Sequence, residues 1–262
     1  MLSFLRNFAL LAVGAILALP AAGAQCTARS GPRTAVLVEL YTSEGCDSCP
    51  PADRWLSSLQ SQGYAPDKVV PLALHVDYWD YIGWKDPYAK REFATRQRRA
   101  AELKRAKIVY TPQVLLQGQD FRKWDSGEFA SAVEKVNSQP PRAKLSLTVE
   151  SMGKASVDVS LSAELLAAAE RKDAAVYLAA FENKLTSRVQ AGENKGKVLP
   201  HDYVVREWVG PLGFGEGLKV EEKRSLPLLP NADPKQSGVA AFVQNRSTGE
   251  VLQALMLPAC GG

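Results

Sequence analysis

The sequence is poor in residues that bind metals or carry redox chemistry, with two histidines, four cysteines and three methionines among 262 residues. Two histidines are too few for a histidine-rich metal site, so that class of site is excluded. The formal net charge is only +4, and the composition gives no reason to expect a nucleic-acid partner. We find no internal repeat, no low-complexity tract and no cofactor motif, and therefore expect no cofactor. Any redox chemistry must depend on the few cysteines.

Long apolar runs are also scarce, and the longest lies near the N-terminus, from Phe8 to Leu19. It follows a single charge, Arg6, and precedes Ala22-Gly23-Ala24, which is typical of a secretory signal peptide and its cleavage site. An uncleaved anchor is the alternative, but the run is shorter than the roughly 20 residues that a membrane span needs. We expect residues 1–24 to be removed and the mature chain to be exported, periplasmic or secreted, without stable membrane insertion.

All four cysteines, Cys26, Cys46, Cys49 and Cys260, would remain in the mature chain. Export places them in an oxidising compartment, where disulfides persist. Four cysteines allow three pairings, and the most economical one joins Cys46 to Cys49. Cys26 and Cys260 would then form a structural disulfide between the two ends of the mature chain, which often lie close together.

The pattern of apolar and polar residues changes near Gln139-Pro140-Pro141. Before this point, apolar runs and helix-like stretches alternate in the order β-α-β-α-β-β-α, and capping-box spacing from Asp125 predicts the start of the last helix. After it, short alternating segments separated by turns predict an antiparallel, sandwich-like β domain. The expected fold class is α/β plus β, with one domain over residues 34–138 and a mainly β domain over residues 141–258.

The most informative motif is Cys46-Asp47-Ser48-Cys49, which follows the apolar run 36–40 and precedes a helix-like segment. A strand that delivers Cys-x-x-Cys to a helix start is the layout of a thiol–disulfide redox site. The unpaired N–H groups and partial positive charge of a helix N-terminus lower the pKa of a thiol, and only the thiolate attacks a disulfide. Cys46 at the helix entrance would attack, and Cys49, one turn in and less accessible, would resolve the mixed disulfide.

With Thr111-Pro112 in the expected order, the first segment resembles the thioredoxin fold. A longer set of motifs resembles the exported, thioredoxin-like family known as domain of unknown function 1223. These motifs are Tyr41-Thr42-Ser43-Glu44-Gly45-Cys46, Cys49-Pro50-Pro51-Ala52-Asp53, His75-Val76-Asp77-Tyr78-Trp79-Asp80, Tyr110-Thr111-Pro112-Gln113 and Gly192-Glu193-Asn194-Lys195-Gly196. The resemblance implies that Pro112 follows a cis peptide bond, faces the cysteines and leaves the backbone of Thr111 free to guide a substrate. It also makes Cys46 the exposed attacking thiol.

Other residues near the motif are candidates for tuning or substrate binding. Asp47 opposes a neighbouring thiolate, whereas the helix dipole favours it, so the direction of electron flow stays open. His75, Asp77 and Trp79 follow an apolar strand at the end where parallel sheets bind ligands, and His75 could transfer protons, although a structural histidine is the simpler interpretation. We expect His201 to make a structural or interdomain contact.

These observations favour an exported thiol–disulfide oxidoreductase that acts on protein thiols or disulfides together with a redox partner protein. Two alternatives remain open. One is a metallochaperone that handles copper or zinc through the two cysteines and His75. The other is a non-catalytic binding module in which Cys46–Cys49 is a structural disulfide. We expect no resident metal.

Overall fold

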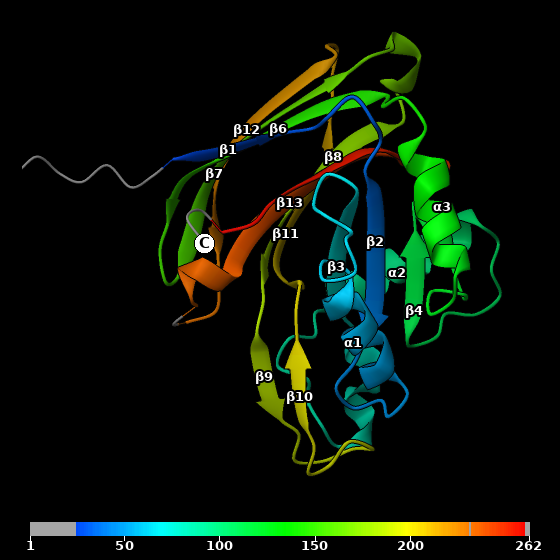
Figure 1. Cartoon of the computed structure of the whole chain (residues 1–262), viewed down its shortest axis with the longest axis vertical. Helices are drawn as coiled ribbons and strands as arrows, with labels where there is room; N and C mark the ends of the chain where they lie inside the picture. The colour runs from blue at the N-terminus through cyan, green and yellow to red at the C-terminus, as the bar shows by residue number, and fades with distance from the viewer. Residues whose placement is uncertain (1–24, 231, 260–262) are drawn as a thin grey trace, which may run out of the picture.

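The computed structural model describes residues 25–230 and 232–259. The predicted signal peptide, residues 1–24, and Cys260 with its predicted bond to Cys26 lie outside the described residues. The fold is mixed α/β and rich in strands, which agrees with the α/β plus β class predicted from the sequence. Three α-helices accompany two sheets and a short ribbon in the described part of the chain (Figure 1).

The larger sheet has eight strands in the order β14-β13-β8-β11-β3-β2-β4-β5. Four of them come from the first segment: β2 (Val36–Thr42), β3 (Val69–His75), β4 (Gln113–Leu116) and β5 (Gln119–Asp120). The other four come from the second: β8 (Ala174–Glu182), β11 (Val204–Gly213), β13 (Ser237–Asn245) and β14 (Val251–Leu257). Strand β11 begins parallel to β3, where Val204 pairs with Ala73. The boundary predicted near residue 140 therefore does not separate two sheets.

The smaller sheet is antiparallel, in the order β1-β6-β7-β12. It contains β1 (Cys26–Arg29), the hairpin of β6 (Ala143–Met152) and β7 (Ser156–Leu165), and β12 (Lys219–Pro227). Side chains of β8 alternate between two cores: Val176 and Leu178 face the smaller sheet, whereas Tyr177 and Phe181 face the helical part. One strand thus contributes to both cores, which is possible because neighbouring side chains of a strand point to opposite faces.

Helices cover both faces of the β2–β3 region. Helix α1 (Cys49–Ser58) packs with α3 (Glu128–Asn137) through Trp55 and Phe129, whose ring centroids lie 5.1 Å apart. Helix α2 (Arg91–Leu103) lies on the opposite face, behind the sheet in Figure 1. Gly127, not Asp125, is the N-cap of α3, and no side-chain cap bond forms, so the predicted capping box is wrong. Ser126 Oγ accepts from Glu128 N at 3.3 Å instead.

The remaining elements are short. They are the 3-10 helices η1 (Asp77–Ile82), η2 (Ala168–Glu170) and η3 (Pro234–Gln236), and the two-stranded ribbon of β9 (Leu185–Arg188) and β10 (Val198–His201). Figure 1 shows this ribbon extending beside α1. None of the helices in the described ranges is both long and apolar enough to cross a membrane.

Candidate functional site

The cysteine pair lies at the junction between β2 and α1. Strand β2 ends at Thr42 and α1 begins at Cys49, with Pro50 and Pro51 in its first turn. The N–H groups of a first turn have no partner within the helix, so proline, which lacks an N–H, removes no helical hydrogen bond there. Cys46 and Cys49 form the predicted disulfide, and their Cα atoms lie 5.5 Å apart. This separation is ordinary for a disulfide. The motif therefore stands at a helix start, as the sequence predicts.

Both cysteines are fully buried, with 0% relative exposure. The expectation that Cys46 is exposed is therefore wrong for this oxidised form. The Sγ atom of Cys46 lies 3.3 Å from the hydroxyl of Ser48 and 3.9 Å from the carbonyl oxygen of Thr111. Ile82 of η1 also closes on the adjacent Gly45, since a Cβ atom there would meet its Cδ1 at 3.0 Å. Sequence spacing could not show this cover because its parts come from distant segments.

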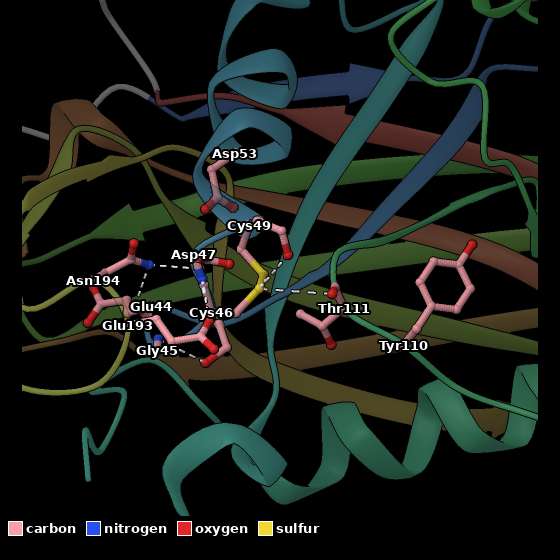
Figure 2. The surroundings of a disulfide bond; sticks show 12 residues. Glu44, Gly45, Cys46, Asp47, Cys49, Asp53, Tyr110, Thr111, Glu193 and Asn194 are labelled. Carbon is pink, nitrogen blue, oxygen red and sulfur yellow. Dashed lines mark hydrogen bonds between the residues drawn. A yellow bond between two sulfur atoms is a disulfide. The ribbon is translucent and has the colours of Figure 1, made fainter. Parts of the chain in front are cut away.

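The Thr111–Pro112 peptide bond is cis, as predicted. Figure 2 shows Thr111 beside the disulfide, with its carbonyl directed toward the sulfur of Cys46. The hydroxyl of Thr111 is hydrogen bonded to that of Tyr78, which donates to Gln97 Oε1 at 3.0 Å. Gln97 is buried on α2, and its amide donates at 2.8 Å to the carbonyl of Tyr110. A chain of hydrogen bonds from α2 thus fixes the loop that faces Cys46.

A segment from the second half also closes over the cysteine loop. We call residues 189–197, between β9 and β10, the strap. Asn194 is fully buried, and its Nδ2 donates to the carbonyls of Glu44 at 2.8 Å and Cys46 at 2.7 Å. Gly192 packs against the same loop, because a Cβ atom there would meet the Cα of Gly45 at 3.5 Å and Ile82 at 3.0 Å. The strap contains Gly192-Glu193-Asn194-Lys195-Gly196, one of the motifs on which the family resemblance depends, but its position next to Cys46 was not predicted.

Asp47 is exposed, and its backbone N–H donates to the carboxylate of Glu193 at 2.9 Å. The backbone N–H of Glu193 in turn donates to the carbonyl of Gly45 at 3.2 Å. The strap therefore adds a second carboxylate beside the residue predicted to tune the cysteines. Two carboxylates next to a thiolate would oppose the effect of the helix dipole.

Beneath the cysteine loop lies a buried polar cluster that contains both histidines of the chain. Nδ1 of His75 lies 2.7 Å from Oδ2 of Asp86, which also accepts from Glu44 N at 2.9 Å. Nε2 of His201 lies 3.0 Å from Oε1 of Glu44, and the two imidazole rings meet at 5.0 Å. His201 thus makes a contact next to the site, through a glutamate two residues before Cys46. Asp86 was not predicted as a site residue because no local motif connects it to His75.

Electrostatics in this cluster follow from burial and pairing. Burial alone would lower the pKa of His75, but the adjacent Asp86 carboxylate raises it above its ordinary value. Burial alone would raise the pKa of Asp86, but His75 lowers it below its ordinary value. The two shifts together favour an imidazolium–carboxylate pair. Burying such a pair is costly unless its remaining polar atoms are bonded. Asp86 meets this condition through the backbone of Glu44 and Tyr88, whereas Nε2 of His75 is buried without a hydrogen-bond partner among the described residues.

Asp53 lies one helical turn after Cys49 on α1, so the two side chains share a face of the helix (Figure 2). It is buried, and burial raises the pKa of its carboxyl above the ordinary value. Its Oδ2 lies 4.0 Å from Nδ1 of His201. A carboxyl group with a raised pKa is suited to exchanging a proton near neutral pH.

The predicted group of His75, Asp77 and Trp79 is divided. His75 ends β3 and is fully buried, and it pairs with Asp86 rather than with Asp77. Asp77 and Trp79 belong to the partly exposed helix η1, where the indole of Trp79 lies 6.3 Å from the ring of Tyr81. Across the described ranges, no group of three or more His, Cys, Asp or Glu side chains is arranged to hold a metal ion.

Comparisons with known proteins give a family and two similar structures. A crystal structure of Protein AGR_C_4864 from Agrobacterium tumefaciens is 25% identical, with a TM-score of 0.63, and the match covers 89% of this chain and 98% of that one. HBP35 of Porphyromonas gingivalis is 15% identical, with a TM-score of 0.58, and the match covers 87% of this chain and 76% of that one, which shows a shared fold alone. A search of curated proteins found no match. The family model described as "Protein of unknown function (DUF1223)" matches residues 37–244, and the chain therefore belongs to this family.

Proposed function

We propose that the protein is an exported thiol–disulfide oxidoreductase with a thioredoxin-like region over residues 34–138. The observation that carries the proposal is the Cys46–Cys49 disulfide at the start of α1, with the carbonyl of Thr111 3.9 Å from Cys46 Sγ beside the cis Pro112. An inert disulfide needs neither a helix N-terminus nor such a loop opposite its sulfur. The element order β2-α1-β3-α2-β4-β5-α3 supports the thioredoxin-like description.

The proposed reaction exchanges one disulfide for another. In the reduced protein, the Cys46 thiolate attacks a disulfide of a partner protein, forms a mixed disulfide and releases one partner thiolate. The Cys49 thiolate then attacks Cys46 Sγ, which breaks the mixed disulfide and releases the second partner thiolate. Two electrons pass to the partner, and Cys46–Cys49 is oxidised. The same steps in reverse oxidise a partner dithiol, and a redox partner protein restores the starting form.

The nearby side chains have proposed roles in these steps. The backbone of Thr111 guides an extended partner segment past Cys46. Asp53 accepts the proton of Cys49 as it becomes the resolving thiolate, because its carboxyl is buried on the same helix face and its pKa is raised. Asp47 and Glu193 tune the thiolate of Cys46 by like-charge repulsion.

A trapping experiment tests this proposal. Cys49→Ser should accumulate mixed disulfides with partner proteins in the native compartment, because the resolving thiol is missing. Cys46→Ser should not, since the attacking thiol is missing, and it differs from the trap variant only in which of the two sulfurs is replaced. Absence of captured partners in Cys49→Ser, together with absence of insulin-disulfide reduction by the wild type, would refute the oxidoreductase function.

A structural disulfide is the second candidate, and the observation that favours it is the complete burial of both sulfurs. A bond that closes so short a loop should stabilise the fold by only about 2 kcal/mol in the chain-entropy model. The Cys46→Ser variant separates the two functions. A structural role predicts a loss of stability of this size with cellular function retained, whereas an exchange role predicts loss of function in a folded protein.

A further inference from the structure

A second concave site lies on the α2 face of the larger sheet, away from the cysteine loop. It is a pocket of about 560 Å³ between α2 and the ends of β8, β11 and the β13–β14 turn. This volume is within the range of small-molecule sites. Tyr177 and Trp208 of the sheet and Ala100 and Leu103 of α2 give it apolar walls.

The charges on the floor of the pocket are paired. The guanidinium of Arg96 packs against the rings of Tyr177 and Trp208, with its Cζ at 5.0 and 4.8 Å from the ring centroids. Its Nε and Nη2 donate to the two carboxylate oxygens of Glu39 at 2.6 and 3.1 Å. In this bidentate ion pair, the charges of Arg96 and Glu39 neutralise each other. The floor therefore gives the pocket aromatic walls and little net charge.

The rim, by contrast, carries excess positive charge. Arg91, Arg99 and Arg246 line the mouth and are exposed. Within residues 25–230 and 232–259, Arg91 and Arg246 have no carboxylate partner, and Arg99 contacts only the exposed Glu102, at 3.4 Å. The single rim carboxylate, Glu92, lies 3.6 Å from its own partner, Lys90. Guanidinium groups that are not already paired recognise carboxylates and related anions well.

We propose that this pocket binds a small amphipathic anion, with an aromatic or acyl body on Tyr177 and Trp208 and a carboxylate between the rim arginines. A purely apolar ligand would gain nothing from the positive charge of the rim, and a cationic ligand would be repelled by its three guanidinium groups. A small polar anion would leave the aromatic walls unused. The proposal is independent of the cysteine chemistry, because the pocket walls and the cysteine loop lie on different parts of the sheet.

Isothermal titration calorimetry with the oxidised mature chain tests this site. The probes are naphthylacetate and naphthylethylamine, which share an aromatic body and differ in the sign of their charge. Naphthylacetate should bind and naphthylethylamine should bind at least tenfold more weakly. Affinity for naphthylacetate should fall as salt is raised, since rim contacts are solvent-exposed and screened.

Three variants locate the binding. Arg246→Glu, on an exposed turn, should weaken naphthylacetate binding roughly tenfold by replacing an attraction with a repulsion. Arg54→Glu is the matched control, because Arg54 is an exposed arginine on α1 outside the pocket, and it should bind as the wild type does. Leu103→Trp should fill the pocket and abolish binding, with circular dichroism to verify folding.

The site would be refuted by any of three results. These are no heat of binding at millimolar naphthylacetate, equal affinity for the two probes, or equal weakening in Arg246→Glu and Arg54→Glu. Cys46→Ser should bind naphthylacetate like the wild type. This arm keeps the result separate from the fate of the proposed oxidoreductase function.

Discussion

The strap should control access to the cysteine pair, and Asn194→Ala tests this directly. Asn194 is fully buried and holds the strap on the cysteine loop through two hydrogen bonds, to the carbonyls of Glu44 and Cys46. Its Oδ1 accepts from Lys197 Nζ at 2.8 Å, which orients the amide. The alanine variant removes both bonds without adding bulk or charge.

The magnitude follows from the two carbonyls that lose their donor. A buried hydrogen bond contributes about 1 kcal/mol net, and an acceptor left without a partner costs about 1 to 3 kcal/mol. The carbonyl of Cys46 still accepts a hydrogen bond from the backbone N–H of Cys49 at 3.3 Å. The larger loss of free energy is therefore expected at the carbonyl of Glu44. We expect the free energy of strap opening to fall by about 3 kcal/mol. This corresponds to a roughly 100-fold larger open population.

The assay is the rate at which an excess of phosphine reductant opens the disulfide under native conditions. Maleimide labelling and mass mapping of the Cys46–Cys49 peptide separate this bond from any other. When opening and closing are fast, the rate of reduction follows the open population. Reduction of Asn194→Ala should therefore be about 100-fold faster than that of the wild type, with the change in global stability measured in parallel by urea unfolding.

Asn137→Ala provides the control. Asn137 lies on α3, and its Nδ2 also donates to two carbonyls, those of Thr34 at 2.9 Å and Lys68 at 3.1 Å. This variant should lose global stability without faster reduction. If Asn194→Ala is reduced at the wild-type rate, or if Asn137→Ala accelerates reduction equally, the strap does not gate the cysteines.

The remaining predictions concern buried charges and one turn. Arg96→Met strands the Glu39 carboxylate, 1% exposed, and the free energy of unfolding in urea should fall by about 3 to 5 kcal/mol; Arg96→Met/Glu39→Leu should recover most of it, and no recovery would contradict the pairing argument. The His75–Asp86 pair should lose its contribution as pH falls through the lowered pKa of Asp86 and as pH rises through the raised pKa of His75, so the stability difference between wild type and His75→Gln should decline above about pH 6.5. A difference that is constant with pH would show that His75 does not titrate with the fold. Gly118→Ala places a Cβ 2.1 Å from the carbonyl of Gly249 at a φ of +74° and should cost more than about 2 kcal/mol. Gly63→Ala, with a φ of +91° and open space, should cost less, and equal losses in thermal unfolding would refute the steric reason.

Much of the fold was predictable because its strongest signals are local. The apolar residues 36–40 and 69–76 predict two buried strands, which are β2 and β3. The alternating residues on either side of Met152-Gly153-Lys154 predict a hairpin, which β6 and β7 form. Helix limits were less accurate. The sequence pattern predicts one long helix from Asp86-Pro87 to about Lys107, but α2 covers only Arg91–Leu103, because Asp86 turns inward to accept from the backbone of Tyr88 and Glu44. The disulfide and the cis Pro112 were also predictable, the first from spacing and the second from family resemblance.

The rest of the site could not be predicted because it is formed by long-range contacts. Strands β9 and β10 have only four residues each, which is too short for a periodicity to identify them. Their ribbon nevertheless brings Asn194 to the carbonyl of Cys46 and His201 to the carboxylate of Glu44. The cover over Cys46 likewise comes from distant segments, including the Thr111 loop and Ile82, whereas a sequence pattern reports only that a cysteine stands at a helix start.

These contacts explain why the cysteine site should depend on the whole chain. Strand β11 covers the edge of β3, where Ala73 N donates to Tyr203 O at 2.8 Å, and the adjacent β10 supplies the partner of Glu44. A fragment that ends near residue 138 would expose the edge of β3, leave Glu44 buried beside no histidine and free the carbonyl of Cys46 from Asn194. The same changes would open the disulfide to reductant and weaken the sheet beneath it. Reactivity and stability of the motif are therefore coupled through the β9–β10 ribbon, which makes the second half of the chain part of the site.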